Sequence, residues 1–171
     1  MPAQAFVTFA YGSNMPTSRL RQRCPSALPL GIAKLHGYEL RWHKKSRDGS
    51  GKCDIVKAAH ANACVYGVLY QIDSTEKTLL DKAEGLGAGY AEIEVNVSFP
   101  DSFMLAKAYQ ATATDPALRP YSWYKTFVLA GAKEHGLPAE YVAQLEAVDA
   151  IDDPDLERHE KNMRLIEGVP A

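Results

Sequence analysis

The feature that most constrains the fold of this chain is the order of its strand-like and helix-like patterns. Short apolar and alternating runs, typical of strands, fill the first two thirds of the sequence, and helical spacing fills the last third. One helix is inserted between the strands; we expect Asp73 and Glu76 to form a capping box at its start and Gly85 to end it. This order predicts a mixed α+β domain and not a series of alternating βαβ units. The predicted strands cover residues 6–10, 63–72, 93–99 and 104–112, with further β-prone stretches between residues 30 and 42.

The last third of the chain predicts three helices. Tyr124 and Phe127 lie at helical spacing in the first, which Gly136 should end. Pro138 suits the first turn of the second helix, which should run to about Val148. Residues 150–171 then form an acidic and exposed helical extension of one domain that spans residues 1–171.

Composition and charge exclude several classes of protein. A chain of 171 residues is long enough for one domain with a sizeable core. Its formal net charge of −2 predicts neither a nucleic-acid partner nor binding to an anionic membrane. No apolar stretch approaches the ~20 residues that span a bilayer, and the N-terminus does not have the pattern of a signal peptide. Three widely spaced cysteines are typical of reduced thiols, so we expect a cytoplasmic protein.

The first strand ends abruptly in the polar sequence Tyr11-Gly12-Ser13-Asn14. A loop of this kind can expose successive backbone N–H groups, which suit a carboxylate or a developing oxyanion. The simpler interpretation is an ordinary turn, because Gly, Ser and Asn dominate turns generally. The loop alone leaves both interpretations open.

Glu84 occupies the last turn of the inserted helix, just before Gly85. The negative end of the helix dipole disfavours the ionised carboxylate there, which suits a group that both accepts and donates a proton. Gly87 and Gly89 follow, so the backbone can turn closely around a ligand. On local grounds alone, a surface glutamate before a capping glycine is the simpler interpretation.

Residues 41–57 are basic and rich in glycine, which predicts a mobile loop. Such a loop could attract an anionic substrate, although a solvated loop is the simpler interpretation. Gly49-Ser50-Gly51-Lys52 is similar to the end of a phosphate-binding P-loop, but Ser46 replaces its first glycine and Cys53 replaces its Ser or Thr. The five histidines lack metal-binding spacing. We therefore expect no metal and no cofactor: neither copper, zinc, nucleotide nor flavin.

Four blocks of sequence, in this order and at this spacing, resemble the γ-glutamylcyclotransferase family. They are Phe9-Ala10-Tyr11-Gly12-Ser13-Asn14-Met15, Val65-Tyr66-Gly67-Val68-Leu69-Tyr70, Leu80-Asp81-x-x-Glu84-Gly85 followed by Tyr90, and Tyr124 with Gly131-Ala132-Lys133-Glu134-His135-Gly136-Leu137-Pro138-x-x-Tyr141. Each block is weak alone, whereas four in register are specific and cover roughly residues 6–148. Residues 42–62 match the family poorly, so the sequence does not determine which leaving group the substrate carries.

The resemblance implies a mixed β-barrel flanked by helices, with Glu84 as the catalytic glutamate. It also implies a substrate loop at the end of the first strand and a substrate contact from Tyr124, while Tyr90 could help to orient the substrate. The expected substrate-binding residues are Thr8, Phe9, Ala10, Tyr11, Gly12, Ser13, Asn14, Tyr90 and Tyr124. A homodimer is implied by the resemblance alone.

The predicted activity is that of a γ-glutamylcyclotransferase, a cyclising acyltransferase or lyase of glutathione metabolism. It converts a γ-glutamyl amide, such as a γ-glutamyl amino acid, to 5-oxoproline and a free amine. The α-amine attacks the γ-carbonyl of the same molecule, which requires correct folding of the substrate more than a cofactor. Glu84 would take a proton from that amine and return it to the leaving group.

Two alternatives remain open at the level of sequence. One is a non-catalytic module that binds γ-glutamyl groups, and Glu84 in its expected block argues against it. The other is a cyclotransferase specific for glutathione, for a γ-glutamyl-amine or for a biosynthetic intermediate.

Overall fold

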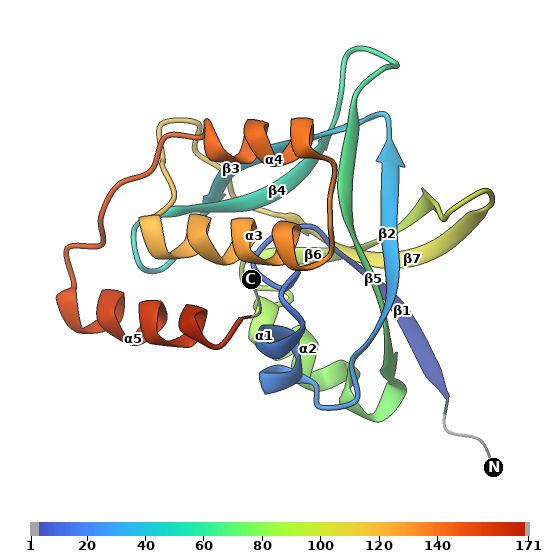
Figure 1. Cartoon of the computed structure of the whole chain (residues 1–171), viewed down its shortest axis with the longest axis horizontal. Coiled ribbons are helices and arrows are strands. Elements are labelled where there is room, and N and C mark those ends of the chain that lie inside the picture. The colour runs from blue at the N-terminus through green and yellow to red at the C-terminus, as the bar shows by residue number, and fades with distance from the viewer. Residues whose placement is uncertain (1–3, 170–171) are drawn as a thin grey trace.

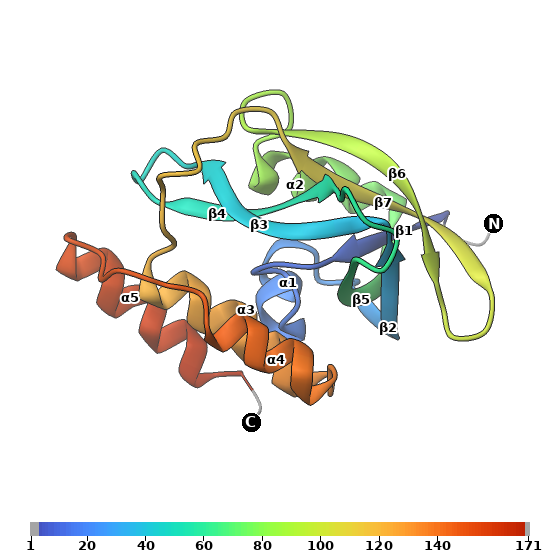
Figure 2. The same ribbon diagram turned by 90° about the horizontal axis from the view of Figure 1, so that it is seen from above.

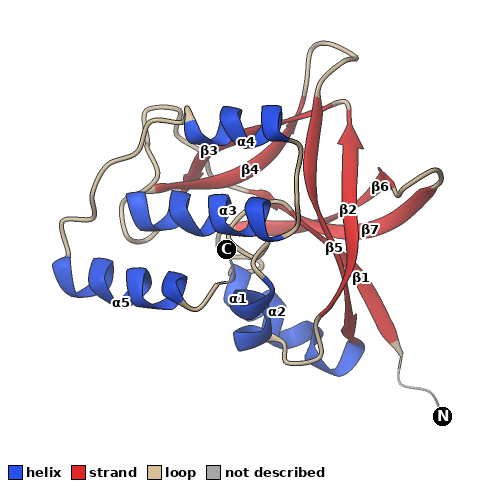
Figure 3. Cartoon of the chain, viewed as in Figure 1, coloured by secondary structure: helices blue, strands red, loops and turns tan. Residues whose placement is uncertain are grey.

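The computed structural model of this chain describes residues 4–169. Strands precede residue 112 and the last three helices follow it, so the predicted α+β order is confirmed (Figure 3). The elements are β1 (Ala5–Ala10), α1 (Thr17–Arg23), β2 (Leu28–His36), β3 (Tyr38–Lys45), β4 (Gly51–Lys57), β5 (Cys64–Asp73), a 3₁₀ turn (Ser74–Glu76), α2 (Lys77–Glu84), β6 (Tyr90–Ser98), β7 (Phe103–Ala111), α3 (Ser122–Glu134), α4 (Ala139–Glu146) and α5 (Leu156–Glu167).

Five strands close into a barrel in the order β1-β5-β2-β6-β7. The pairs β1–β5, β5–β2, β2–β6 and β6–β7 are antiparallel, whereas β7 returns beside β1 in parallel through Lys107 and Thr8. The barrel is therefore mixed, as the resemblance implied. Helices α3, α4 and α5 gather on one side of it in two perpendicular views (Figures 1 and 2).

Hydrophobic patterning explains the positions of the barrel strands. Strand β5 is a nearly continuous apolar run and lies between β1 and β2, with both of its edges paired. Strand β6 alternates instead: Val95 and Val97 are buried, and Glu94 and Asn96 are exposed. This alternation places one face of β6 in the core and the other in solvent.

Strands β3 and β4 form a separate two-stranded sheet, so the prediction of a mobile loop over residues 41–57 was wrong. The backbone pairs regardless of the basic side chains, and a buried carboxylate connects the sheet to the barrel. Asp54 accepts a hydrogen bond from the Ala111 N–H at 2.8 Å, and its other oxygen lies 2.7 Å from Nε2 of His43. Composition did not reveal this anchor.

The predicted capping box before α2 was only half right. Asp73 does cap the 3₁₀ turn, since its carboxylate accepts the Thr75 N–H at 2.9 Å. Glu76 does not reach back to Asp73 and instead accepts the Ser26 N–H at 3.1 Å, which ties the turn to the segment before β2. The predicted end of α2 is confirmed, because Gly85 adopts a left-handed conformation with φ +67°.

Helix α3 packs directly against the segment that follows β1. A Cβ on Gly131 would lie 2.5 Å from the Met15 Cβ and 2.7 Å from the Pro16 ring, so only glycine permits this approach. The contact holds the start of α1 against α3. Within residues 4–169, no helix combines the length and apolar character that crossing a membrane requires.

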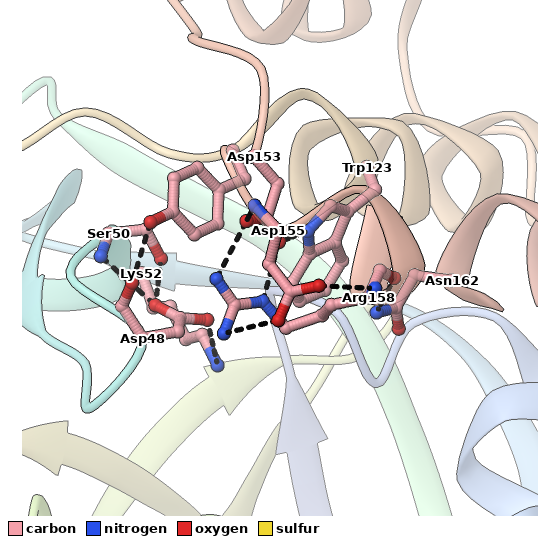
Figure 4. Close-up of polar contacts among 9 residues, drawn as sticks. Asp48, Ser50, Lys52, Trp123, Asp153, Asp155, Arg158 and Asn162 are labelled. Carbon is pink, nitrogen blue, oxygen red and sulfur yellow. Dashed lines mark hydrogen bonds and ion pairs between the residues drawn. The ribbon is translucent and has the colours of Figure 1, made fainter. Parts of the chain in front are cut away.

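The C-terminal helix α5 contains no buried residue, yet it is not a free extension. Its Arg158 donates two hydrogen bonds of 2.6 Å to the buried carboxylate of Asp153, and the Trp123 indole of α3 donates a third at 2.9 Å (Figure 4). The Arg158 guanidinium and these donors hold the pKa of Asp153 well below its usual range. This anchor fastens α5 to the beginning of α3.

Candidate active site

A cleft opens where β1 ends. All ten residues that the sequence predicts as site residues line it, although strands, a loop and two helices contribute them. Their catalytic and binding roles stay predictions. The full lining consists of Thr8, Phe9, Ala10, Tyr11, Gly12, Ser13, Asn14, Leu20, Cys53, Leu80, Glu84, Tyr90, Tyr109 and Tyr124.

The loop after β1 presents backbone donors to this cleft. The Met15 N–H closes a turn onto the Gly12 carbonyl at 3.1 Å, so the turn that we considered as the simpler interpretation is present. Within residues 4–169, however, the N–H groups of Gly12, Ser13 and Asn14 have no hydrogen-bond acceptor. Consecutive unpaired N–H groups form a concavity that suits an anion. The turn and the anion cradle are therefore compatible.

The loop packs closely against its neighbours at Gly12. A Cβ at this position would lie 3.1 Å from the Cys53 Cβ and 3.2 Å from the Tyr124 hydroxyl. The absence of a side chain lets the loop approach both residues. The Gly12 backbone consequently lies beside the hydroxyl of a predicted substrate contact.

Glu84 faces the loop from the end of α2. The Asn14 side-chain amide donates a hydrogen bond to Glu84 Oε1, and Arg23 Nη1 lies 3.4 Å from the same oxygen. Arg23 also donates to Asn14 Oδ1 at 2.7 Å, so the three side chains form one network. The Glu84 side chain is 15% exposed, so a ligand in the cleft can reach it. The other carboxylate of the helix, Asp81, is instead engaged by Lys77 at 2.8 Å.

Two tyrosine hydroxyls form hydrogen bonds with the backbone N–H and C=O of Cys53. Tyr124 accepts the Cys53 N–H at 3.0 Å, and Tyr90 donates to the Cys53 carbonyl at 2.7 Å. A β-bulge makes this possible: Arg41 pairs with Asp54 but Lys44 pairs with Lys52, so Cys53 has no direct partner across the hairpin. Its backbone groups are satisfied by the tyrosines.

The Tyr124 hydroxyl differs from those of the other cleft tyrosines in having only a weak side-chain partner, the Cys53 thiol. Tyr11 donates to the Tyr109 carbonyl, Tyr109 donates to Asp81 at 2.6 Å, and Tyr90 donates to Cys53. Among the described residues, no oxygen or nitrogen accepts the Tyr124 proton, and a thiol is a weak acceptor, so a ligand can take this proton in place of Cys53. Burial raises the pKa values of Tyr11, Tyr90 and Tyr124 well above their usual range, so these hydroxyls are protonated at neutral pH.

Four residues of the cleft lining were not predicted as site residues from the sequence: Leu20, Cys53, Leu80 and Tyr109. Leu20 and Leu80 are buried and form an apolar part of the cleft wall. Burial also raises the pKa of the Cys53 thiol, which makes it a poor nucleophile at neutral pH. The helical pattern of α1 and α2 could have indicated the two leucines, whereas Cys53 and Tyr109 reach the cleft only through strand register.

Within the part of the chain that the structure describes, no three His, Cys, Asp or Glu residues lie close enough to hold a metal ion. The carboxylate of Glu84, the unpaired N–H groups of the loop after β1 and the Tyr124 hydroxyl meet in one cleft. Such a set can bind a small polar molecule and move one of its protons.

Comparisons with known proteins agree on one family. Residues 64–145 match the model of the AIG2-like family. The sequence is 33% identical over 155 residues to the gamma-glutamylcyclotransferase of Bos taurus and 32% identical over 155 residues to that of Homo sapiens, covering 87% of this chain and 81% of each relative. A solved structure of a gamma-glutamyl cyclotransferase superposes with a TM-score of 0.86 at 29% identity, covering 96% of this chain and 99% of the other.

Proposed function

This chain belongs to the γ-glutamylcyclotransferase family, and we propose that it converts a γ-glutamyl amide to 5-oxoproline and a free amine with Glu84 as the proton shuttle. The contact between Glu84 and Asn14 carries the assignment of roles. It places Glu84, the one carboxylate in the cleft lining of the described residues, against the loop whose N–H groups lack acceptors among those residues. Proton transfer and anion binding are thereby available at neighbouring points.

The reaction needs three tasks from the protein. The substrate's α-ammonium group must lose a proton, the tetrahedral oxyanion must be stabilised, and the departing nitrogen must gain a proton. A bond forms between the α-nitrogen and the γ-carbonyl carbon, and the amide bond from that carbon to the leaving nitrogen breaks. Because attack is intramolecular, holding the substrate in a folded conformation supplies much of the rate.

Glu84 can perform the first and third tasks in turn. Between the ammonium group and the lactam the α-nitrogen loses two protons, and the leaving nitrogen gains two on becoming an ammonium ion. The Glu84 carboxylate can carry a proton from one nitrogen to the other, so no net proton is consumed. Asn14 and Arg23 hold Glu84 Oε1, which leaves Oε2 for the substrate. Asn14 and Arg23 are accordingly positioning residues.

The loop and Tyr124 supply donors for negative charge. The N–H groups of Gly12, Ser13 and Asn14 suit either the substrate's α-carboxylate or the oxyanion. The Tyr124 hydroxyl lies beside Gly12 and adds a donor on the same side of the cleft. Tyr90 cannot donate in this state, because its proton is bound to the Cys53 carbonyl, and we assign it a role in shaping the cleft.

Location and assembly are further parts of the proposal. Cys24, Cys53 and Cys64 are all unpaired, in keeping with the reducing cytoplasm. A homodimer is proposed from the family resemblance, and sedimentation velocity would measure it.

The direct test is to incubate the purified protein with γ-glutamyl dipeptides, γ-glutamyl-amines and glutathione, and to detect 5-oxoproline by mass spectrometry. We expect 5-oxoproline and the free amine in equal amounts from at least one of these substrates. If none of them yields 5-oxoproline while the protein still binds them, the chain is a binding module and the proposed function is wrong.

A further inference from the structure

The loop after β1 is held in place from outside the cleft, at the residue that follows Asn14. The carbonyl of Met15 accepts a hydrogen bond from the Tyr70 hydroxyl of β5 at 2.7 Å, and the Met15 N–H closes the turn onto Gly12 at 3.1 Å. Met15 and Tyr70 are both completely buried. Both backbone polar groups of Met15 are therefore bonded, so the loop that carries the unpaired N–H groups ends at a fixed point.

The Tyr70 hydroxyl is the centre of a buried polar cluster. Thr17 Oγ1 lies 2.9 Å from the hydroxyl oxygen, and His135 Nε2 lies 3.1 Å from it. Burial raises the pKa of Tyr70 to about 12, so the hydroxyl keeps its proton at neutral pH. Because this one proton goes to the Met15 carbonyl, a neighbour that bonds to the Tyr70 oxygen has to donate to it.

Glu134 joins this cluster to the first turn of α1. Its Oε1 accepts the Thr17 N–H at 3.3 Å, and its Oε2 lies 3.4 Å from His135 Nε2. Pro16, the residue before α1, has no side-chain oxygen for the first N–H groups of the helix. The Glu134 carboxylate of α3 supplies one, at the end of the helix dipole that favours negative charge. With a carboxylate and two hydroxyl oxygens around it, Nε2 of His135 carries a proton.

The segment of residues 15–17 that this cluster holds connects two parts of the cleft. The loop with the unpaired N–H groups, residues 12–14, precedes it. Helix α1 follows it and ends at Arg23, which bonds to the Asn14 side chain at 2.7 Å and lies 3.4 Å from Glu84. A shift of residues 15–17 would consequently move the anion-binding loop and the partner of Glu84 together.

We propose that Tyr70, Glu134 and His135 are positioning residues of the reaction, which hold the N–H groups of the loop in the geometry that binds the negative charge of the substrate. This inference rests on the proposed function. The three residues lie outside the cleft lining and act through the backbone of Met15 and Thr17. The side chains of Glu134 and His135 are only 13% and 12% exposed, so water competes little for their hydrogen bonds.

Tyr70→Phe tests the central contact, because it keeps the buried ring and removes the hydroxyl that bonds to Met15. For the γ-glutamyl substrate that is turned over fastest, kcat/KM should fall at least ~10-fold, since small displacements of binding groups are costly. Tyr121→Phe is the matched control. The Tyr121 hydroxyl also donates to a backbone carbonyl, that of Asp48 at 2.6 Å, and Tyr121 is buried outside the cleft lining. Its loss should lower the melting temperature comparably and leave kcat/KM nearly unchanged.

Two pairs of substitutions separate the hydrogen bonds of the cluster from its general stability. Glutamine keeps an acceptor at position 134 and a donor at position 135, whereas alanine has neither. We therefore expect Glu134→Gln and His135→Gln to retain several-fold more activity than Glu134→Ala and His135→Ala. Thermal unfolding of each variant sets a temperature at which all of them are folded, and the kinetics are compared there.

Hydrogen exchange of the Met15 amide is a readout that does not depend on turnover. This N–H is bonded to the Gly12 carbonyl, so its exchange rate reports how often the turn opens. The exchange should be several-fold faster in Tyr70→Phe than in the unaltered protein, and unchanged in Tyr121→Phe.

Three results would overturn the proposal. They are normal kcat/KM in a folded Tyr70→Phe protein, equal losses of activity in Tyr70→Phe and Tyr121→Phe, and equal activities of the glutamine and alanine variants. The last two would show that the cluster supports the fold in general and does not position the loop.

If the unaltered protein yields no 5-oxoproline, the proposed function fails, and Met15 exchange with calorimetric binding of γ-glutamyl-alanine then decides the inference. Faster exchange together with weaker binding in Tyr70→Phe would sustain the positioning role of the cluster. Unchanged exchange, unchanged binding or absent binding would refute it.

Discussion

The side-chain amide of Asn14 donates a hydrogen bond to the carboxylate of Glu84, 70 residues further along the chain. This contact joins the loop after β1 to the end of α2, and Arg23 completes it by bonding Asn14 Oδ1 at 2.7 Å. Asn14→Ala should release the Glu84 carboxylate without opening the core. We expect kcat to fall about 10-fold, the effect of losing one hydrogen bond to a charged group, with little change in the free energy of unfolding.

Steady-state release of 5-oxoproline measures this effect, with Asn96→Ala as control, because Asn96 is exposed on β6 and lies outside the cleft lining. Unchanged turnover in Asn14→Ala would mean that Glu84 does not depend on this contact.

Removing the hydroxyl of Tyr124 and removing that of Tyr90, which both bond to the backbone of Cys53, should have unequal effects on activity. Tyr124→Phe removes a hydroxyl whose proton is bound to no oxygen or nitrogen of the described residues, whereas Tyr90→Phe removes one already bound to a carbonyl. Tyr124→Phe should lower kcat/KM at least ~10-fold and Tyr90→Phe distinctly less. Each leaves one buried backbone group unpaired, so both should destabilise the fold by about 1–3 kcal/mol.

The similar cost in stability makes Tyr90→Phe an internal control for Tyr124→Phe. Chemical denaturation would measure that cost beside the kinetics. Equal losses of activity in the two variants would refute a donor role for Tyr124.

Gly12→Ala should impair catalysis more than folding. The added methyl group would press on Cys53 and the Tyr124 hydroxyl, at 3.1 and 3.2 Å. The loop or its neighbours must then shift by a few tenths of an ångström, and we expect the shift to displace the N–H donors of the loop or the Tyr124 hydroxyl. Loss of activity at least ~10-fold with a preserved far-ultraviolet circular dichroism spectrum is expected, since misplaced catalytic groups are costly. Normal turnover would contradict the proposed anion cradle.

Asp153 predicts a pH dependence of stability. Its folded-state pKa is depressed by Arg158, so its contribution is complete at neutral pH and is lost as protons bind below the ordinary Asp value of roughly 3.9. Asp153→Asn should therefore lower the free energy of unfolding by about 2 kcal/mol at pH 7, and this loss should shrink as pH falls below about 4. Urea unfolding at several pH values measures it.

A difference between the two proteins that stays constant from pH 7 to the acid limit would refute this linkage. A smaller difference in the free energy of unfolding that remains at low pH would reflect the altered contact with Trp123 rather than the ion pair.

Local sequence predicted the parts of the molecule that local patterns control. The apolar run of β5, the alternation of β6 and the left-handed stop at Gly85 each depend on neighbouring residues alone. The predicted loop residues are contiguous, so placing one of them places the others. The combination of the loop with Glu84, in contrast, was predictable only from the family resemblance, because nothing local relates the end of β1 to the end of α2.

The features that sequence missed depend on register and long-range contacts. The basic composition of residues 41–57 concealed a hairpin whose buried Asp54 bonds to β7. Cys53 reaches the tyrosines because a bulge removes its partner, and Tyr109 reaches the cleft from a strand register that no local pattern encodes. Asp153 looked like part of an acidic exposed tail, although it is among the most buried carboxylates of the described chain.

The most direct test of this account is the turnover of Glu84→Gln. The amide keeps the size of the carboxylate but cannot accept the proton of the attacking amine, so kcat for 5-oxoproline formation should fall at least ~100-fold. Glu94→Gln is the matched control, since Glu94 lies exposed on β6 and should retain full activity. A folded Glu84→Gln protein that turns over within a few-fold of the unaltered one would contradict the assignment of Glu84 as the proton shuttle.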